Sequence, residues 1–114
     1  KLKAYLNPYK KELVLGPFKG LPACNRIEIG KGVCGTAVAT REVQLVPDVN
    51  LFPGHIACDS ASKSELVVPI IKDDIVYGVL DLDSPEVKRF SKLEEEYLIK
   101  LVNVLNDYIN WNNI

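Results

Sequence analysis

Three cysteines with different neighbours are the residues of this chain best suited to chemistry. Cys24, Cys34 and Cys58 each lie in a segment that contains glycine or proline, and none lies in a periodic apolar stripe. Buried structural cysteines usually belong to apolar segments, whereas reactive ones lie in exposed, polar or helix-start positions. We therefore expect thiol chemistry, in which one cysteine attacks, a second resolves, and the third is a spare or recharging site.

The position of each thiol suggests what controls its reactivity. Cys34 follows Gly-Lys-Gly-Val at the predicted start of a short helix, where the helix dipole would favour a thiolate; a tight strand-to-helix turn is the plainer explanation of the glycines. Cys58 lies three residues after His55, the single histidine. His55 lowers the pKa of that thiol or simply fills the loop. A zinc site of His55 with the three cysteines is not favoured, because no Cys-x-x-Cys pair is present.

Carboxylates form a second candidate cluster. In a strand over 75–83, Asp81 and Asp83 share one face, while Leu80 and Leu82 point to the other. A tight turn at 72–74 would pair this strand antiparallel with a strand over 65–71, which brings Glu65 to the same open end of the hairpin. The three acids can then converge, or they form a solvated polar edge of a sheet.

The elements that position these groups predict an α+β fold. Strands are expected at 3–6, 12–16, 26–29 and 42–47 besides the hairpin, with irregular chain over 17–26 and a long loop over 48–63. A short helix is expected over 33–40. The clearest helix covers 91–109, where apolar residues recur every three to four positions and Ser91 and Glu94 form a capping box. The sum is an antiparallel sheet of about five strands with helices on at least one face.

Bulk properties exclude several function classes. The 114 residues fit one domain, and the net charge of −1 comes without a basic stripe, so neither nucleic acid nor a membrane is an expected partner. No apolar run is long enough to cross a bilayer. An odd number of cysteines without a signal peptide predicts the cytoplasm. The strand-like start predicts a single domain over 1–114 that lacks an N-terminal helix.

Ordered blocks of this sequence resemble the free methionine-(R)-sulfoxide reductases, a family of enzymes built on a GAF domain. The resemblance runs from about residue 12 to the C-terminal helix and is carried by Gly-Pro-Phe-x-Gly-x-Pro-Ala-Cys at 16–24, Gly-Lys-Gly-Val-Cys-Gly-Thr-Ala at 30–37, Asp-Val at 48–49, Gly-His-Ile-Ala-Cys-Asp at 54–59, Ser-Glu at 64–65, Pro-Ile at 69–70 and Gly-Val-Leu-Asp-x-Asp at 78–83. One difference lies in the first strand, which in the family reads Trp-x-Gly-Phe-Tyr-Leu. Of that pattern this chain keeps only Tyr5 and Leu6, and the family's tryptophan is replaced by Lys1.

The resemblance implies a six-stranded antiparallel sheet flanked by helices, and it implies roles for individual residues. Cys58 takes the catalytic position, Cys24 the resolving position that forms a disulfide with it, and Cys34 that of the third cysteine. The positions of the family's substrate-binding residues are held by Glu65, Asp81, Asp83 and Tyr5.

The expected activity is thiol-dependent reduction of free methionine-(R)-sulfoxide, recycled by a thioredoxin-type reductant during oxidative stress, with no cofactor and no metal. The resemblance also allows a homodimer. Two alternatives are a GAF module that binds a small ligand without catalysis, and an inactive relative of the reductase.

Overall fold

A six-stranded antiparallel sheet forms the centre of the molecule. The computed structural model describes residues 2–8, 12–20, 24–56 and 61–113. Along the sheet the strands follow the order β3-β2-β1-β6-β5-β4, and every pairing between neighbours is antiparallel. Their bounds are Leu2–Leu6 (β1), Glu12–Lys19 (β2), Arg26–Glu28 (β3), Gln44–Val46 (β4), Ser64–Lys72 (β5) and Ile75–Ser84 (β6). The predicted α+β architecture and the six strands implied by the resemblance are confirmed.

The β5–β6 hairpin is the best-defined part of the sheet. Its two-residue turn consists of Asp73 and Asp74, which adopt positive φ values of 52° and 67°. Positive φ at both positions matches the right-handed twist of paired strands. The resulting register places Glu65 opposite Asp83 and Val67 opposite Asp81. The hairpin predicted from the sequence is therefore confirmed.

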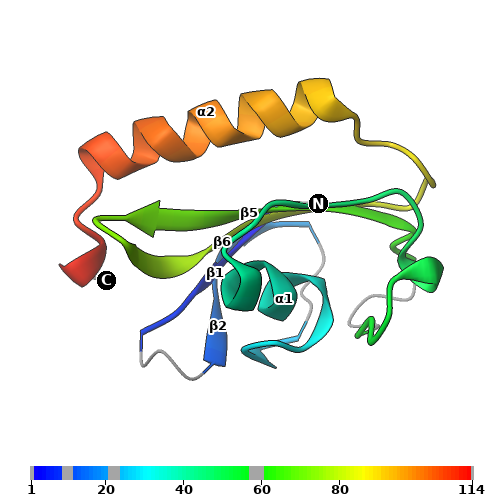
Figure 1. Ribbon diagram of the computed structural model, residues 1–114, viewed down its shortest axis with the longest axis horizontal. Coiled ribbons are helices and arrows are strands. Elements are labelled where there is room, and N and C mark those ends of the chain that lie inside the picture. Colours follow the sequence, from blue (N-terminus) through cyan, green and yellow to red (C-terminus); the bar gives the residue numbers. More distant parts are fainter. Residues whose placement is uncertain (1, 9–11, 21–23, 57–60, 114) are drawn as a thin grey trace.

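Helices cover both faces of the sheet (Figure 1). Helix α1 (Gly32–Thr40) packs on the face formed by Tyr5, Val67 and Val79, and helix α2 (Lys92–Tyr108) packs on the opposite face. Because side chains alternate along a strand, β6 contributes Val79 to the first core and Leu80 to the second. In the described part of the chain, no helix combines the length and apolar character needed to cross a bilayer.

The expected end of β2 at residue 16 was wrong, because the strand continues to Lys19. Lys3 pairs with Phe18 and Tyr5 with Leu15, so Gly16 and Pro17 together lie opposite the single residue Ala4. Such an irregularity is a place where proline and glycine are tolerated inside a strand. A Cβ atom at Gly16 would lie 3.1 Å from the carbonyl oxygen of Ala4.

Two other boundaries also differ from expectation. The strand predicted over 42–47 is limited to β4, where it pairs with β5. The segment predicted as a long loop contains a short 3-10 helix, Val49–Leu51, which is capped by the Asp48 side chain. The hairpin loop at 9–11 and the middle of the long segment, 57–60, lie outside the described residues.

Helix α2 begins at the predicted capping box. The Ser91 hydroxyl accepts a hydrogen bond from the Leu93 amide, and the Glu94 carboxylate accepts one from the Ser91 amide. The cap satisfies backbone donors that the first turn of a helix leaves unpaired.

We expect Ser91→Ala to lower the free energy of unfolding by about 1 kcal/mol, because the cap bond to the Leu93 amide is lost. Urea denaturation measures this change. Lys92→Ala is the matched control, since it removes an exposed side chain one position later and should change stability by less than about 0.5 kcal/mol. Equal unfolding midpoints for the two variants would show that the cap contributes nothing.

Candidate functional site

Polar side chains from three adjacent strands gather on the face of the sheet that α1 covers. Asp81 and Asp83 lie on the central strand β6, Glu65 lies opposite Asp83 on β5, and Lys3 lies opposite Asp81 on β1. All four residues are buried, and Asp81 is only 2% exposed. The predicted convergence of the three acids is confirmed. The alternative of a solvated sheet edge is wrong, because α1 packs across β5 and β6 and closes this face.

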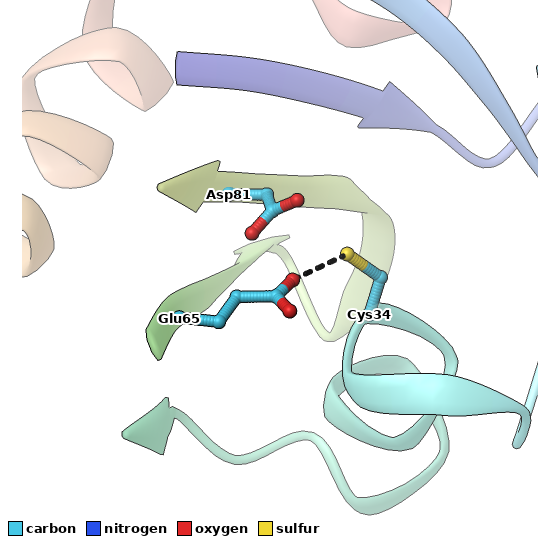
Figure 2. Close-up of side chains that lie close together, drawn as sticks. All are labelled: Cys34, Glu65 and Asp81. Carbon is cyan, nitrogen blue, oxygen red and sulfur yellow. Dashed lines mark hydrogen bonds between the residues drawn. The ribbon is translucent and has the colours of Figure 1, made fainter. Parts of the chain in front are cut away.

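Helix α1 brings a thiol to the acids. Figure 2 shows the Cys34 side chain pointing toward Glu65 and Asp81, and the Cys34 Sγ lies 3.8 Å from Glu65 Oε2. One side-chain atom from each of the three residues lies within 4.8 Å of the others. The neighbouring Gly35 permits this placement, because a Cβ atom there would lie 2.5 Å from the carbonyl oxygen of Glu28.

The buried acids hold their protons more tightly than ordinary carboxyls. Burial and the nearby Asp83 charge raise the pKa of Asp81 to about 6. Burial and the Asp81 charge raise the pKa of Glu65 well above its usual value. Asp81 Oδ1 is buried and has no hydrogen-bond partner within the described residues. Two desolvated carboxyls side by side cannot both ionise easily, so the pair can retain and donate a proton.

The same surroundings suppress ionisation of Cys34. Burial raises the pKa of the Cys34 thiol well above its usual value, and the charges of Asp81 and Glu65 raise it further. The sequence-based expectation of a thiolate at this helix start is therefore wrong. The dipole of a short helix contributes only partial charges, whereas burial and full carboxylate charges nearby oppose the anion more strongly. Cys34 is a neutral thiol that donates its hydrogen bond to Glu65.

Lys3 is a site residue that the sequence analysis missed. Its side chain is 4% exposed, its Nζ forms an ion pair with Asp83 Oδ2, and it lies 3.6 Å from Asp81 Oδ2. The signal was present in the sequence, since Lys3 is two positions before Tyr5 and strand alternation places both side chains on one face. Tyr5 is also buried, and its hydroxyl donates a hydrogen bond of 2.9 Å to the carbonyl oxygen of Cys24.

Of the remaining predicted site residues, the structure describes Cys24 and His55 but not Cys58. Cys24 is disulfide-bonded and packs beside the core under α1, whereas Cys34 is a free thiol. Cys58 lies outside the described residues, so its disulfide with Cys24 stays a prediction. His55 lines the same pocket as the acids.

The structure groups possible metal ligands that differ from the set of His55 and three cysteines considered in the sequence. Cys34, Glu65 and Asp81 are close enough to share an ion. The Lys3 ammonium already supplies positive charge to this cluster, which disfavours a cation there.

A small pocket opens onto these groups. Its volume is about 40 Å³, and its polar lining includes Lys3, Cys34, Glu65, Asp81 and Asp83. Gly32, Val33 and Ile56 add apolar surface to the wall. The carboxyls can protonate an oxygen that reacts beside them, and they can bind a cationic group where it takes the place of the Lys3 ammonium.

Comparison with known proteins shows the family of the chain. The model of the GAF domain matches residues 6–109. Free methionine-R-sulfoxide reductase of Saccharomyces cerevisiae is 54% identical over 95 residues, which are 82% of this chain and 53% of that protein. The Escherichia coli protein of the same name is 54% identical over 90 residues, which are 79% of this chain and 54% of that protein.

Solved structures show the same fold. The free methionine-R-sulfoxide reductase of Neisseria meningitidis, solved in complex with its substrate, superposes with a TM-score of 0.91 at 40% identity. The match covers 98% of this chain and 68% of that one. The chain thus spans about half the length of the two curated relatives it matches and two thirds of this solved structure. On this sequence and fold similarity, the chain belongs to the GAF domain family, and within it is similar to the free methionine-R-sulfoxide reductases.

Proposed function

We propose that this domain reduces free methionine-(R)-sulfoxide to methionine with electrons from its own thiols. The observation that carries the proposal is a buried carboxyl pair, Glu65 and Asp81, with raised pKa values at a pocket that also holds a thiol. The similarity to named free methionine-R-sulfoxide reductases supports the same reaction. A non-catalytic ligand-binding module would not need a protonated acid beside a thiol.

The reaction proceeds in two steps, formation of a sulfenic acid and formation of a disulfide. The Cys58 thiolate attacks the sulfoxide sulfur while the carboxyl pair gives a proton to the oxygen, and the oxygen passes to Cys58 as a sulfenic acid. Methionine leaves with its sulfur reduced by two electrons. The Cys24 thiol then attacks the sulfenic acid, which releases water and leaves a Cys24–Cys58 disulfide. Cys34 stays a neutral thiol beside Glu65 and is not the attacking group.

Recognition of a free amino acid follows from the acids. A free substrate carries an α-ammonium group, which a methionine residue inside a protein lacks. Buried carboxylates without a cation are costly, so acids that no other cation neutralises favour a ligand with an ammonium group. We assign the ammonium contact to Asp83 and the wall beside it to Tyr5.

Reduction of the disulfide completes the cycle. A thioredoxin-type dithiol exchanges with the Cys24–Cys58 bond and restores both thiols. Such recycling requires a reducing compartment, so we also propose a cytoplasmic location. We also propose a homodimer, which rests on the resemblance.

A turnover assay tests the proposed activity. The purified protein should form methionine from free methionine-(R)-sulfoxide when thioredoxin, thioredoxin reductase and NADPH are supplied. The S epimer is the control and should not be reduced. Binding of the R epimer without formation of methionine would favour the inactive relative or the binding module.

A separate prediction concerns the disulfide between Cys24 and Cys58. Reduced protein treated with substrate but no reductant should lose two thiols per chain, because the sulfenic acid is resolved within the molecule. Peptide mapping should then join the peptides that contain these two residues. A mapped bond between Cys34 and either partner would contradict the assignment.

A further inference from the structure

A lysine is built into the acidic pocket. Lys3 lies on β1 directly opposite Asp81, with its Nζ paired to Asp83 and 3.6 Å from Asp81 Oδ2. The residue is only 3% exposed, although lysine is almost never fully buried unless it is paired. This ammonium therefore lies at the carboxylates that would bind the ammonium of a substrate.

The charge of Lys3 persists in this environment. Burial lowers the pKa of the lysine, but the carboxylates of Asp81 and Asp83 outweigh that effect and raise it above its usual value. Glu65, opposite Asp83 on β5, adds to the same attraction. Like charges opposite each other in a sheet destabilise it, and the Lys3 ammonium compensates for that repulsion.

The lysine side chain also takes up space. The pocket that Lys3 lines has a volume of about 40 Å³. A cavity of about 150 Å³ is large enough to bind benzene, so a space of this size does not hold an amino acid. Because the Lys3 Nζ is paired to Asp83, an incoming α-ammonium must displace it to reach that carboxylate.

We propose that Lys3 is a specificity-determining residue: its ammonium occupies the cation position at Asp81 and Asp83, and it thereby weakens the preference of this pocket for ligands with a free amino group. The inference deepens the proposed function and rests on it for the identity of the ligand. Because Lys3 already neutralises the acids, a ligand without an ammonium no longer leaves buried carboxylates unpaired. Such a ligand is therefore not rejected.

Calorimetry with two matched ligands tests this inference without any turnover. L-Methionine carries the α-ammonium, and 4-(methylsulfanyl)butanoate is the same molecule without the amino group. Both are titrated into the wild-type protein, Lys3→Ala, Lys3→Met and Lys19→Ala. Lys19 is exposed at the end of β2, so its variant is the control for loss of a lysine outside the pocket.

The variants separate charge from volume. In the wild type, the two ligands should bind with affinities within about threefold of each other, because Lys3 satisfies the acids. Lys3→Ala removes the charge and opens space, and should shift the ratio toward L-methionine by at least about tenfold. Lys3→Met removes the charge but fills the space, so it should not gain affinity for L-methionine. Lys19→Ala should match the wild type.

A double variant identifies the partner of the displaced lysine. Adding Asp83→Asn to Lys3→Ala should remove most of the gain, because the ammonium then lacks its main carboxylate. A wild-type protein that already prefers L-methionine a hundredfold would overturn the inference, and this result needs no variant to fold. An unchanged ratio in folded Lys3→Ala would overturn it as well.

The turnover assay and the calorimetry together distinguish an error in the proposed reductase activity from an error in the role of Lys3. If neither the wild type nor Lys3→Ala reduces the sulfoxide, but Lys3→Ala shifts the calorimetric ratio, the reductase proposal fails and the role of Lys3 stands. If the wild type turns over and the ratio does not shift, the reductase stands and the role of Lys3 is overturned.

Discussion

Replacing Cys58 by serine is expected to abolish the reduction of free methionine-(R)-sulfoxide, with kcat falling by at least about a thousandfold. A serine hydroxyl cannot supply the two electrons that the sulfoxide accepts, and it cannot form the sulfenic acid. Formation of methionine in a single turnover, without recycling, is the measurement, because it detects the first chemical step alone.

Cys34→Ser is the matched control for this prediction. The buried Cys34 thiol lies 3.8 Å from Glu65 and is held protonated by its surroundings, so its loss should alter the carboxyl pair without removing the nucleophile. A single turnover should remain at a reduced rate. Complete loss in Cys34→Ser, together with a surviving first turnover in Cys58→Ser, would exchange the roles of the two cysteines.

The second large effect is expected at the carboxyl pair. Asp81→Asn and Glu65→Gln should each lower kcat by about 10²–10⁴-fold, which is the usual contribution of a general acid. The effect should fall mainly on kcat, because the proton is needed in the transition state and not for binding. Glu28→Gln, an exposed position on β3, is the control. Variants at Asp81 and Glu65 within a few-fold of the wild type would contradict the proposed proton transfer.

The pH dependence provides an independent check of the same pair. Burial and neighbouring carboxylates raise the pKa of both acids, to about 6 for Asp81. The protonated form is the donor, and it is lost as pH rises through the raised pKa. The single-turnover rate should therefore decline above about pH 6, after correction for ionisation of the attacking thiol. Glu65→Gln should change this decline of the rate with pH. An unchanged pH–rate profile in that variant would show that another group titrates.

Local patterns in the sequence determined the hairpin that carries the acids and the start of the long helix. The period-two pattern over 75–83 and the Asp73–Asp74 turn were sufficient for the β5–β6 hairpin, because its strands are adjacent in sequence and its register follows from the turn. The capping box at Ser91 likewise placed the start of α2. Alternation along β6 correctly separated Asp81 and Asp83 from Leu80, because it depends only on backbone geometry.

Long-range packing decided the burial of the acidic face and the length of β2, which local patterns could not predict. Whether the face with Asp81 meets water depends on α1, which is distant in sequence, so a polar edge and a buried acidic pocket had equal support. The continuation of β2 past Gly16 depends on pairing with β1.

The chemistry of the site was decided by the tertiary structure for the same reason. Cys34 was expected to ionise because the start of its helix is a local feature, whereas its burial and the carboxylates that raise its pKa come from β5 and β6. The ion pair of Lys3 with Asp83 joins residues 80 positions apart. The sequence alone determined which residues could react and which face each occupies. Burial and charge in the assembled pocket decide their protonation and partners, because both depend on groups that only the fold brings together.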